Sequence, residues 1–177
     1  MTALLPPAVE RRSFSEVRSN GRRLEGYAAT FGSEARMGSI VETIAPGAFS
    51  SALAGDVLAL LDHDTGKVLG RTRFDTLRLT EDSRGLAVSL DLPDTQAGRD
   101  ALALAERGDL GGMSFGFTVP KGGESWAGER RTLRSIGLKE ISGKANTTHA
   151  TVASSSRSLA HGHDSTHRDL GRHRTAG

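Results

Sequence analysis

His63 is the first residue in this chain whose type and position suggest chemistry. It is the only histidine in the first 148 residues, and the other five lie in the last 29. It follows the apolar run 57–61 and precedes a predicted turn; on a strand, its neighbours Asp62 and Asp64 face away from it. Because an imidazole takes up and releases a proton near neutral pH, His63 is the candidate general base of an enzyme that works without a cofactor.

A second reactive group, the hydroxyl of Ser114, lies in a Gly-x-Ser-x-Gly segment at residues 112–116. Side chains alternate along a strand, so the serine shares one face with the two glycines, while Met113, Phe115 and Phe117 share the core face. The open face allows another chain to approach the hydroxyl, as a nucleophile requires. The alternative interpretation is a stripe of small residues beneath a packed helix.

The third candidate is Glu140, in the segment Leu138–Ser142. On a strand its side chain points the same way as those of Leu138 and Ser142 and opposite to that of Ile141. A partly buried carboxylate needs a partner, and orienting an imidazole while stabilising its protonated form is one such role. A solvated carboxylate on an edge strand is the alternative.

Short strands with two helical interruptions are predicted to position these residues. Alternation and apolar runs predict strands at 12–18, 24–31, 40–44, 57–61, 74–79, 86–90, 111–119 and 131–142. A hairpin turn is predicted at 81–85 and a Gly-rich loop at 121–128. The best helix runs over 95–107, with Asp94 or Thr95 as its cap and Gly108 at its end, and a shorter helix extends from Pro46 to about Gly55. This pattern is typical of a mainly β body with a few helices, either a small barrel or a sandwich.

Composition narrows the function classes. The 177 residues suit one domain, with 25% charged and 36% apolar residues. The absence of cysteine excludes disulfides, thiolate metal sites and a cysteine nucleophile. A formal charge of +2 gives no reason to expect a specific nucleic-acid partner. No apolar stretch approaches the roughly 20 residues of a membrane span. The N-terminal segment 1–7 is too short, and lacks the positive charge, for a signal peptide.

The character of the sequence changes after about Gly143. Residues 1–143 form the predicted domain, and 144–177 a flexible tail rich in Ser, His and Arg, with too few large apolar residues to offset the entropy of ordering. The tail has closely spaced histidines at His161, His163 and His167, but no neighbours that would hold them in tetrahedral geometry, so no metal site is expected. Its arginines are interpreted as solvated charges; they are Arg157, Arg168, Arg172 and Arg174.

Five short segments together resemble one protein family. They are Glu25–Ala28, Ala45–Phe49, Asp62–Asp64 followed by Leu69–Thr72, Met113–Phe117 and Leu138–Ser142. In this order, over about residues 10–143, they resemble the prohead (procapsid) maturation proteases of tailed phages.

The resemblance implies a serine endopeptidase related to the herpesvirus assemblins, with a mainly β (α+β) fold: a small closed β-barrel surrounded by helices. By position, Ser114 corresponds to the nucleophile, His63 to the general base and Glu140 to the third member. Backbone N–H groups near Ser114, such as that of Phe115, are candidates for the oxyanion site. Arg71 is a candidate supporting charge, although a plain surface role for it stays open.

The resemblance also implies the setting of the activity. The expected substrate is scaffold or capsid precursor protein inside the procapsid in the host cytoplasm, encoded by a phage or a prophage, and self-cleavage is expected too. No cofactor or metal, a homo-oligomer such as a dimer, and neither a specific nucleic-acid partner nor a membrane are expected.

The chain departs from the family pattern after the Glu-Ile-Ser strand. Family members continue with an apolar stretch and a Pro-Ala segment, whereas this chain continues with residues 143–149 and has no proline after Pro120. This indicates a truncation or a change of reading frame, and it questions how the Glu140 strand is anchored. The competing interpretation is therefore a capsid-assembly or scaffold protein that retains the fold without cleaving.

Overall fold

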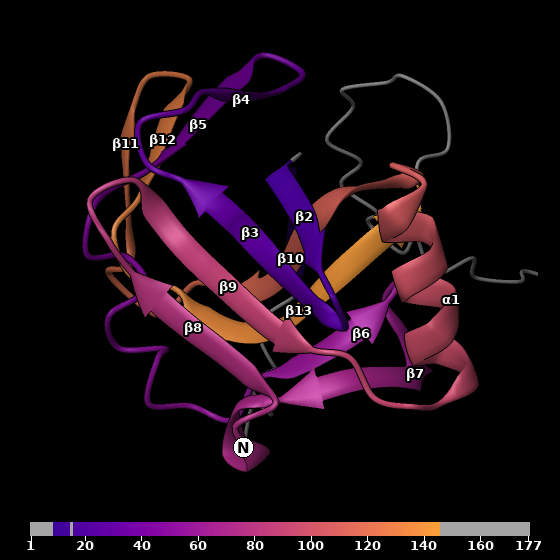
Figure 1. Ribbon diagram of the computed structural model, residues 1–177. Coiled ribbons are helices and arrows are strands. Elements are labelled where there is room, and N and C mark those ends of the chain that lie inside the picture. Colours follow the sequence, from indigo (N-terminus) through magenta and orange to yellow (C-terminus); the bar gives the residue numbers. More distant parts are fainter. Residues whose placement is uncertain (1–8, 15, 146–177) are drawn as a thin grey trace, which may run out of the picture.

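A computed structural model describes residues 9–14 and 16–145, which form three β-sheets and, within that range, one α-helix (Figure 1). The five-stranded sheet, in spatial order, consists of β1 (Glu10–Phe14), β10 (Leu110–Thr118), β13 (Gly137–Ala145), β6 (Leu58–Leu61) and β7 (Asp64–Arg71). One four-stranded sheet consists of β11 (Glu124–Ala127), β12 (Arg130–Leu133), β5 (Ile40–Ile44) and β4 (Ala35–Met37). The other consists of β2 (Glu16–Asn20), β3 (Arg23–Thr30), β9 (Gly85–Asp91) and β8 (Leu77–Glu81).

Strand β10 lies inside the five-stranded sheet, between β1 and β13, and one of its faces builds the core. Met113, Phe115 and Phe117 are buried there, as the alternation predicted. The ring of Phe115 meets that of Phe49 edge-on, with 5.7 Å between centroids. Burying each such aromatic side chain contributes roughly 1.5–3 kcal/mol, so the segment around Phe49 stabilises β10 from behind.

The predicted long helix is confirmed as α1 (Gln96–Glu106). The side chain of Thr95 accepts a hydrogen bond from the N–H of Gly98, which satisfies one amide of the first turn, and Gly108 follows with φ of 74°. In Figure 1 the helix lies beside the hairpin of β6 and β7.

The predicted short helix between Pro46 and Gly55 is wrong. This segment forms successive turns in which most hydrogen bonds span three residues, such as that from the N–H of Ala52 to the carbonyl of Phe49. Gly47 has φ of 87°, which a right-handed helix does not allow. The carboxylate of Glu81 instead accepts from the N–H groups of Gly47 and Phe49.

The predicted closed barrel surrounded by helices is also wrong. Closure requires the two edge strands of a sheet to pair with a matching stagger, but in the described part of the chain β1 and β7 do not pair with each other. The predicted strand 12–18 is two strands, β1 and β2, which belong to different sheets. The sheets are therefore joined by packed and ion-paired side chains rather than by one continuous hydrogen-bond ladder.

Two further boundaries differ from the sequence prediction. The predicted loop 121–128 contains β11, which pairs with β12, and the residues after His63 form strand β7. A 3₁₀ turn, η1 (Thr72–Phe74), connects β7 to β8. The predicted flexible tail, with its histidines and arginines, lies outside the described residues except for Lys144 and Ala145.

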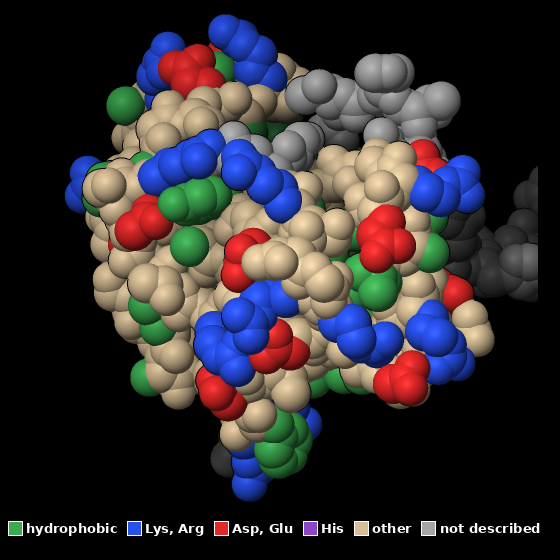
Figure 2. Space-filling view, in the orientation of Figure 1, with side chains coloured by type: hydrophobic (Ala, Val, Ile, Leu, Met, Phe, Trp, Pro, Cys, Tyr) green, Lys and Arg blue, Asp and Glu red, His purple; other side chains and the backbone are tan. Residues whose placement is uncertain are grey.

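The outer face of the β2-β3-β9-β8 sheet is charged in both signs (Figure 2). Asp91, for example, pairs with both Arg23 and Arg78. One face in solvent and one on the core is the usual arrangement of an antiparallel sheet. As for membranes, the part of the chain that the structure covers has no helix with the length and apolar character of a span.

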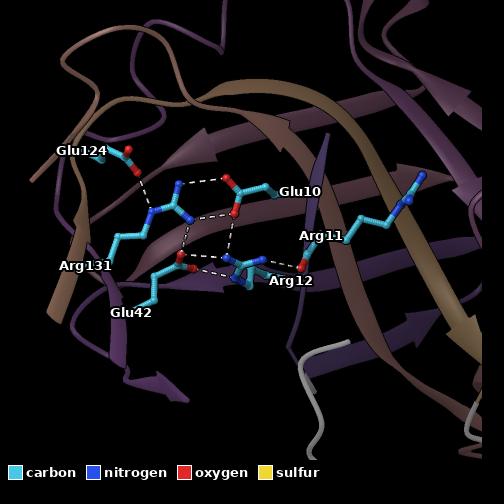
Figure 3. A network of polar contacts seen from close by, with 6 residues as sticks. All are labelled: Glu10, Arg11, Arg12, Glu42, Glu124 and Arg131. Atoms are coloured by element: carbon cyan, nitrogen blue, oxygen red, sulfur yellow. Dashed lines mark hydrogen bonds and ion pairs between the residues drawn. The ribbon is translucent and has the colours of Figure 1, made fainter. Parts of the chain in front are cut away.

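A buried network of ion pairs holds edge strand β1 against β5, β11 and β12 (Figure 3). Glu42 of β5 is 2% exposed and accepts from Arg12 at 2.5 and 2.7 Å and from Arg131 at 2.9 Å. Arg131 also bonds Glu10 at 2.7 and 2.8 Å and Glu124 at 2.5 Å. Burial opposes ionisation of Glu10, but the hydrogen bonds and charges of Arg131 and Arg12 together lower its pKa. All of these charged groups are paired, as buried charges must be.

We predict that Glu42→Ala strongly destabilises the fold, because two guanidinium groups lose a buried partner. Removing one member of a buried ion pair costs about 3–5 kcal/mol, which should appear as a lower midpoint in denaturant unfolding. Glu34→Ala is the matched control, since Glu34 forms a single pair with the exposed Arg130. Equal midpoints for the two variants would contradict the role of the network.

Candidate active site

The side chains of Ser114, His63 and Glu140 form a hydrogen-bonded chain. The Oγ atom of Ser114 lies 2.7 Å from Nε2 of His63, and Nδ1 of His63 lies 2.8 Å from Oε1 of Glu140. With its proton on Nδ1, the imidazole donates to the carboxylate and accepts from the hydroxyl. The structure thus brings together three residues that are far apart in sequence, with one ring between an alcohol and a carboxylate.

His63 lies in a tight turn rather than at the end of a strand. Strands β6 and β7 are joined by Asp62 and His63, whose φ angles are 52° and 58°. A two-residue turn with both φ positive matches the twist of a hairpin, but it normally contains Asn or Gly. A histidine in this conformation costs roughly 1–2 kcal/mol, so the surrounding contacts must hold it there.

Strand β13 supplies those contacts. The N–H of His63 donates to Oγ of Ser142 at 2.7 Å, and the N–H of Asp62 donates to the carbonyl of Gly143 at 2.9 Å. The carboxylate of Asp62 in turn accepts from the N–H of Ala145 at 3.1 Å. The turn is therefore fixed to the same strand that carries Glu140.

An irregularity in β13 directs Glu140 to the site. Gly116 pairs with Glu140, but the next residue, Phe117, pairs with Leu138, so Lys139 has no partner of its own on β10. Such a bulge reverses the alternation of side chains. Leu138 therefore joins the hydrophobic core while Glu140 faces His63, which corrects the prediction that both point the same way.

Gly116 leaves the space that the Glu140 carboxyl occupies. A Cβ atom at position 116 would lie 2.8 Å from both Cγ and Oε1 of Glu140. On the other side, strand β1 places Arg11 opposite Gly116, and Nε of Arg11 donates to Oε1 of Glu140 at 3.2 Å. The carboxylate thus contacts groups from two other parts of the sheet.

The electrostatic environment lowers the pKa of His63. Burial contributes most, because it disfavours the imidazolium, while the hydrogen bond and charge of Glu140 oppose this effect. The charges of Arg11 and Lys144 lower the pKa further. A neutral imidazole, able to accept a proton, is therefore maintained to a lower pH than for a histidine in water.

Ser114 is fully buried in the described conformation, with 0% of its surface exposed. The side chains of His63 and Glu140 remain 13% and 11% exposed. The hydroxyl is therefore shielded from solvent in this conformation, and a peptide substrate would need local opening to reach it.

Of the two oxyanion candidates, Arg71 lies away from the three residues, whereas Phe115 directly follows Ser114 on β10. Arg71 forms a two-pronged ion pair with Asp56, with contacts of 2.6–2.9 Å. It pairs with Leu58, the residue of β6 farthest from the turn, which is roughly 10 Å along the strand from Leu61. The side chain of Phe115 is in the core, and its backbone lies between paired strands on both sides, where the sheet uses its N–H. The structure does not bring Arg71 to the three residues.

Sequence reasoning missed three contributors: Arg11, Ser142 as the anchor of the turn, and the packing role of Gly116. Only the last left a signal, since two glycines flanking a strand serine indicate a need for space. The described residues contain no group of three or more His, Cys, Asp or Glu side chains that could hold a metal ion.

A comparison with family models finds a match to the caudovirus prohead serine protease family over residues 9–165. Searches of curated proteins and of solved structures find no match. The matched range includes Ser114, His63 and Glu140, and it covers well over half of the chain.

We predict that Gly116→Ala displaces the Glu140 carboxylate, because the new methyl group would overlap it. The pKa of His63 should then fall below its wild-type value, since the contact that raises it is lost; an NMR titration of the His63 ring measures this. Overpacking should also cost about 1–3 kcal/mol of stability.

Gly143→Ala is the control for this experiment. Gly143 lies on the neighbouring strand, and a Cβ there would meet its nearest atoms at ordinary distances of 3.5 and 3.7 Å. An unchanged His63 titration in Gly116→Ala would contradict the proposed packing role.

Proposed function

The chain belongs to the caudovirus prohead serine protease family, and from this we propose that it is an endopeptidase with Ser114 as nucleophile, His63 as general base and Glu140 as the orienting carboxylate. The observation that carries the proposal is the chain of contacts of 2.7 and 2.8 Å through one imidazole. A serine hydroxyl is a poor nucleophile until a base removes its proton during attack, and a base at this distance meets that requirement.

In the proposed mechanism, Oγ of Ser114 attacks the scissile carbonyl carbon while Nε2 of His63 takes the hydroxyl proton. The imidazolium then protonates the leaving amine as the C–N bond breaks, which leaves an acyl ester on Ser114. His63 next deprotonates a water molecule that attacks the ester, and the proton returns to Oγ as the acid product leaves. Glu140 accepts the Nδ1–H hydrogen bond and stabilises the imidazolium in both steps. General acid–base catalysis by a positioned group such as His63 contributes roughly 10²- to 10⁴-fold.

Family membership also supports the substrate. We propose that the enzyme cleaves scaffold or capsid precursor protein inside the procapsid, within the host cytoplasm, and that it cleaves itself as well. The prohead named in the family description supports the substrate and its setting, whereas self-cleavage is a prediction from the sequence resemblance. Action as a homo-oligomer, and the relation to herpesvirus assemblins, remain predictions from the sequence.

The burial of Ser114 supports a second candidate function. A nucleophile with no exposed surface also suits a capsid-assembly or scaffold protein that keeps the fold but does not cleave. The two candidates differ in whether the hydroxyl ever reacts.

We predict that the wild-type protein, expressed with its own capsid precursor, shortens that precursor, whereas Ser114→Ala does not. The change removes the oxygen that forms the acyl ester. Ser13→Ala is the matched control, because Ser13 is the partner of Ser114 on β1 and is exposed; it should cleave normally. Equal processing by wild type and Ser114→Ala would remove Ser114 from the mechanism.

Labelling with a serine-directed phosphonate separates the two candidates without a substrate. The protease predicts labelling of the folded wild type that is lost in His63→Ala, since the base is missing. Absence of labelling in the wild type, with unfolding behaviour confirming a folded sample, favours the assembly protein.

Self-cleavage makes a separate prediction. Prolonged incubation of the wild type should give products of lower intact mass, and Ser114→Ala should keep its full-length mass. A wild-type sample that processes the precursor but keeps its own mass would contradict self-cleavage alone.

A further inference from the structure

Strand β1 carries two neighbouring arginines that point in opposite directions. Arg12 enters the buried network, where it bonds Glu42, whereas Arg11 extends away from the network (Figure 3). On its own side of the sheet, Arg11 donates from Nε to Oε1 of Glu140 at 3.2 Å. This is the same oxygen that lies 2.8 Å from Nδ1 of His63.

We propose that Arg11 is a positioning residue: it fixes the Glu140 carboxylate against His63 and offsets part of its charge, so that the imidazole stays neutral and able to act as a base. The inference rests on the proposed function and extends it to a residue outside the catalytic three.

The pairing of the strands makes this contact possible. Arg11, Gly116 and Glu140 form one row across β1, β10 and β13. Because Gly116 has no side chain, Arg11 and Glu140 meet over it. A slip of β1 by one residue would turn Arg11 to the opposite face, and the pairing of Arg12 with Glu42, whose side chain is 2% exposed, opposes such a slip.

The sharing of one oxygen limits how strongly Glu140 acts on the ring. A carboxylate that also pairs with a guanidinium stabilises the imidazolium less than a carboxylate that serves the ring alone. The Nε contact also restricts rotation of the carboxyl group, which keeps Oε1 directed at Nδ1. Orientation and charge therefore both depend on Arg11.

The charged groups around His63 come from β13, β1, the turn and the start of β7. Glu140 and Lys144 approach from β13 and Arg11 from β1. On the turn itself, Asp62 accepts from the N–H of Ala145; directly after it, at the start of β7, Asp64 accepts from the N–H of Gly66 and pairs with Lys67. Among these, Arg11 is the cation that bonds directly to the carboxylate contacting the ring.

Loss of the Arg11 charge therefore changes the pH dependence in a defined direction. The imidazolium loses a repelling neighbour and gains the full attraction of Glu140, so the pKa of His63 rises. Since the base must be neutral to accept the serine proton, activity on the acid side should fall at a higher pH than in the wild type. Glu140→Gln should move the same limb to lower pH, because it removes the attraction.

The test measures kcat/KM against pH, together with NMR titration of the His63 ring, for Arg11→Met, Arg11→Gln and Arg11→Lys. Arg11→Met and Arg11→Gln should raise the pKa of His63 and move the acid limb of the kcat/KM profile to higher pH. They should also lower the plateau value of kcat/KM on the order of ten- to a hundredfold, the loss typical of a misplaced reacting group. Lys should restore the pKa, because it keeps the charge. Arg18→Met, an exposed arginine of β2, is the control and should match the wild type.

A purely structural role for Arg11 would lower the plateau without moving the His63 pKa, and that result overturns the proposal. The NMR titration needs no turnover, so it decides the role of Arg11 even if the protein does not cleave. Conversely, a Ser114→Ala variant as active as the wild type would overturn the proposed function, and the result of the titration would still stand.

Discussion

The site depends on the two hydrogen bonds that the Oε1 atom of Glu140 accepts. This atom joins β13 to the turn between β6 and β7 through His63 and to β1 through Arg11. These three elements enter the sheet from distant parts of the sequence. A largely buried carboxylate needs hydrogen-bond and charge partners, and Glu140 has one imidazole and one guanidinium. The same partners set the geometry that the proposed chemistry requires.

The two faces of β10 divide structural and chemical roles. One face buries Phe115 against Phe49 and fixes the strand in the core. The other carries Ser114 and, at Gly116, leaves the space that the Glu140 carboxyl occupies. Stability on the first face offsets strain near the second, where His63 adopts a positive φ and is held by Ser142. Local strain of this kind persists only where surrounding contacts over-determine the conformation.

Features with a short sequence period could be predicted, and features that depend on distant pairing could not. The alternation in β10 identified the core residues, and the cap at Thr95 located α1. The predicted open face around Ser114 is wrong, because Ser114 and its flanking glycines are buried. The bulge at Lys139 and the turn at His63 arise from how strands pair, which no local pattern encodes. The prediction of a closed barrel was wrong for the same reason, since closure depends on whether the two edge strands of a sheet pair with each other. Arg11 resembles any strand arginine until its partner across Gly116 is known.

The departure from the family pattern after Gly143 leaves Glu140 anchored. Strand β13 pairs with β10 on one side, as far as Ala145, and with β6 on the other, from Glu140 to Gly143. Two ladders and the bonds of Asp62 to Gly143 and Ala145 hold the strand without an apolar continuation. A non-cleaving protein would therefore owe its inactivity to the covering of Ser114 rather than to a displaced carboxylate. The serine, imidazole and carboxylate are already in hydrogen-bond contact, so the proposed chemistry requires the site to open but does not require the three residues to be brought together.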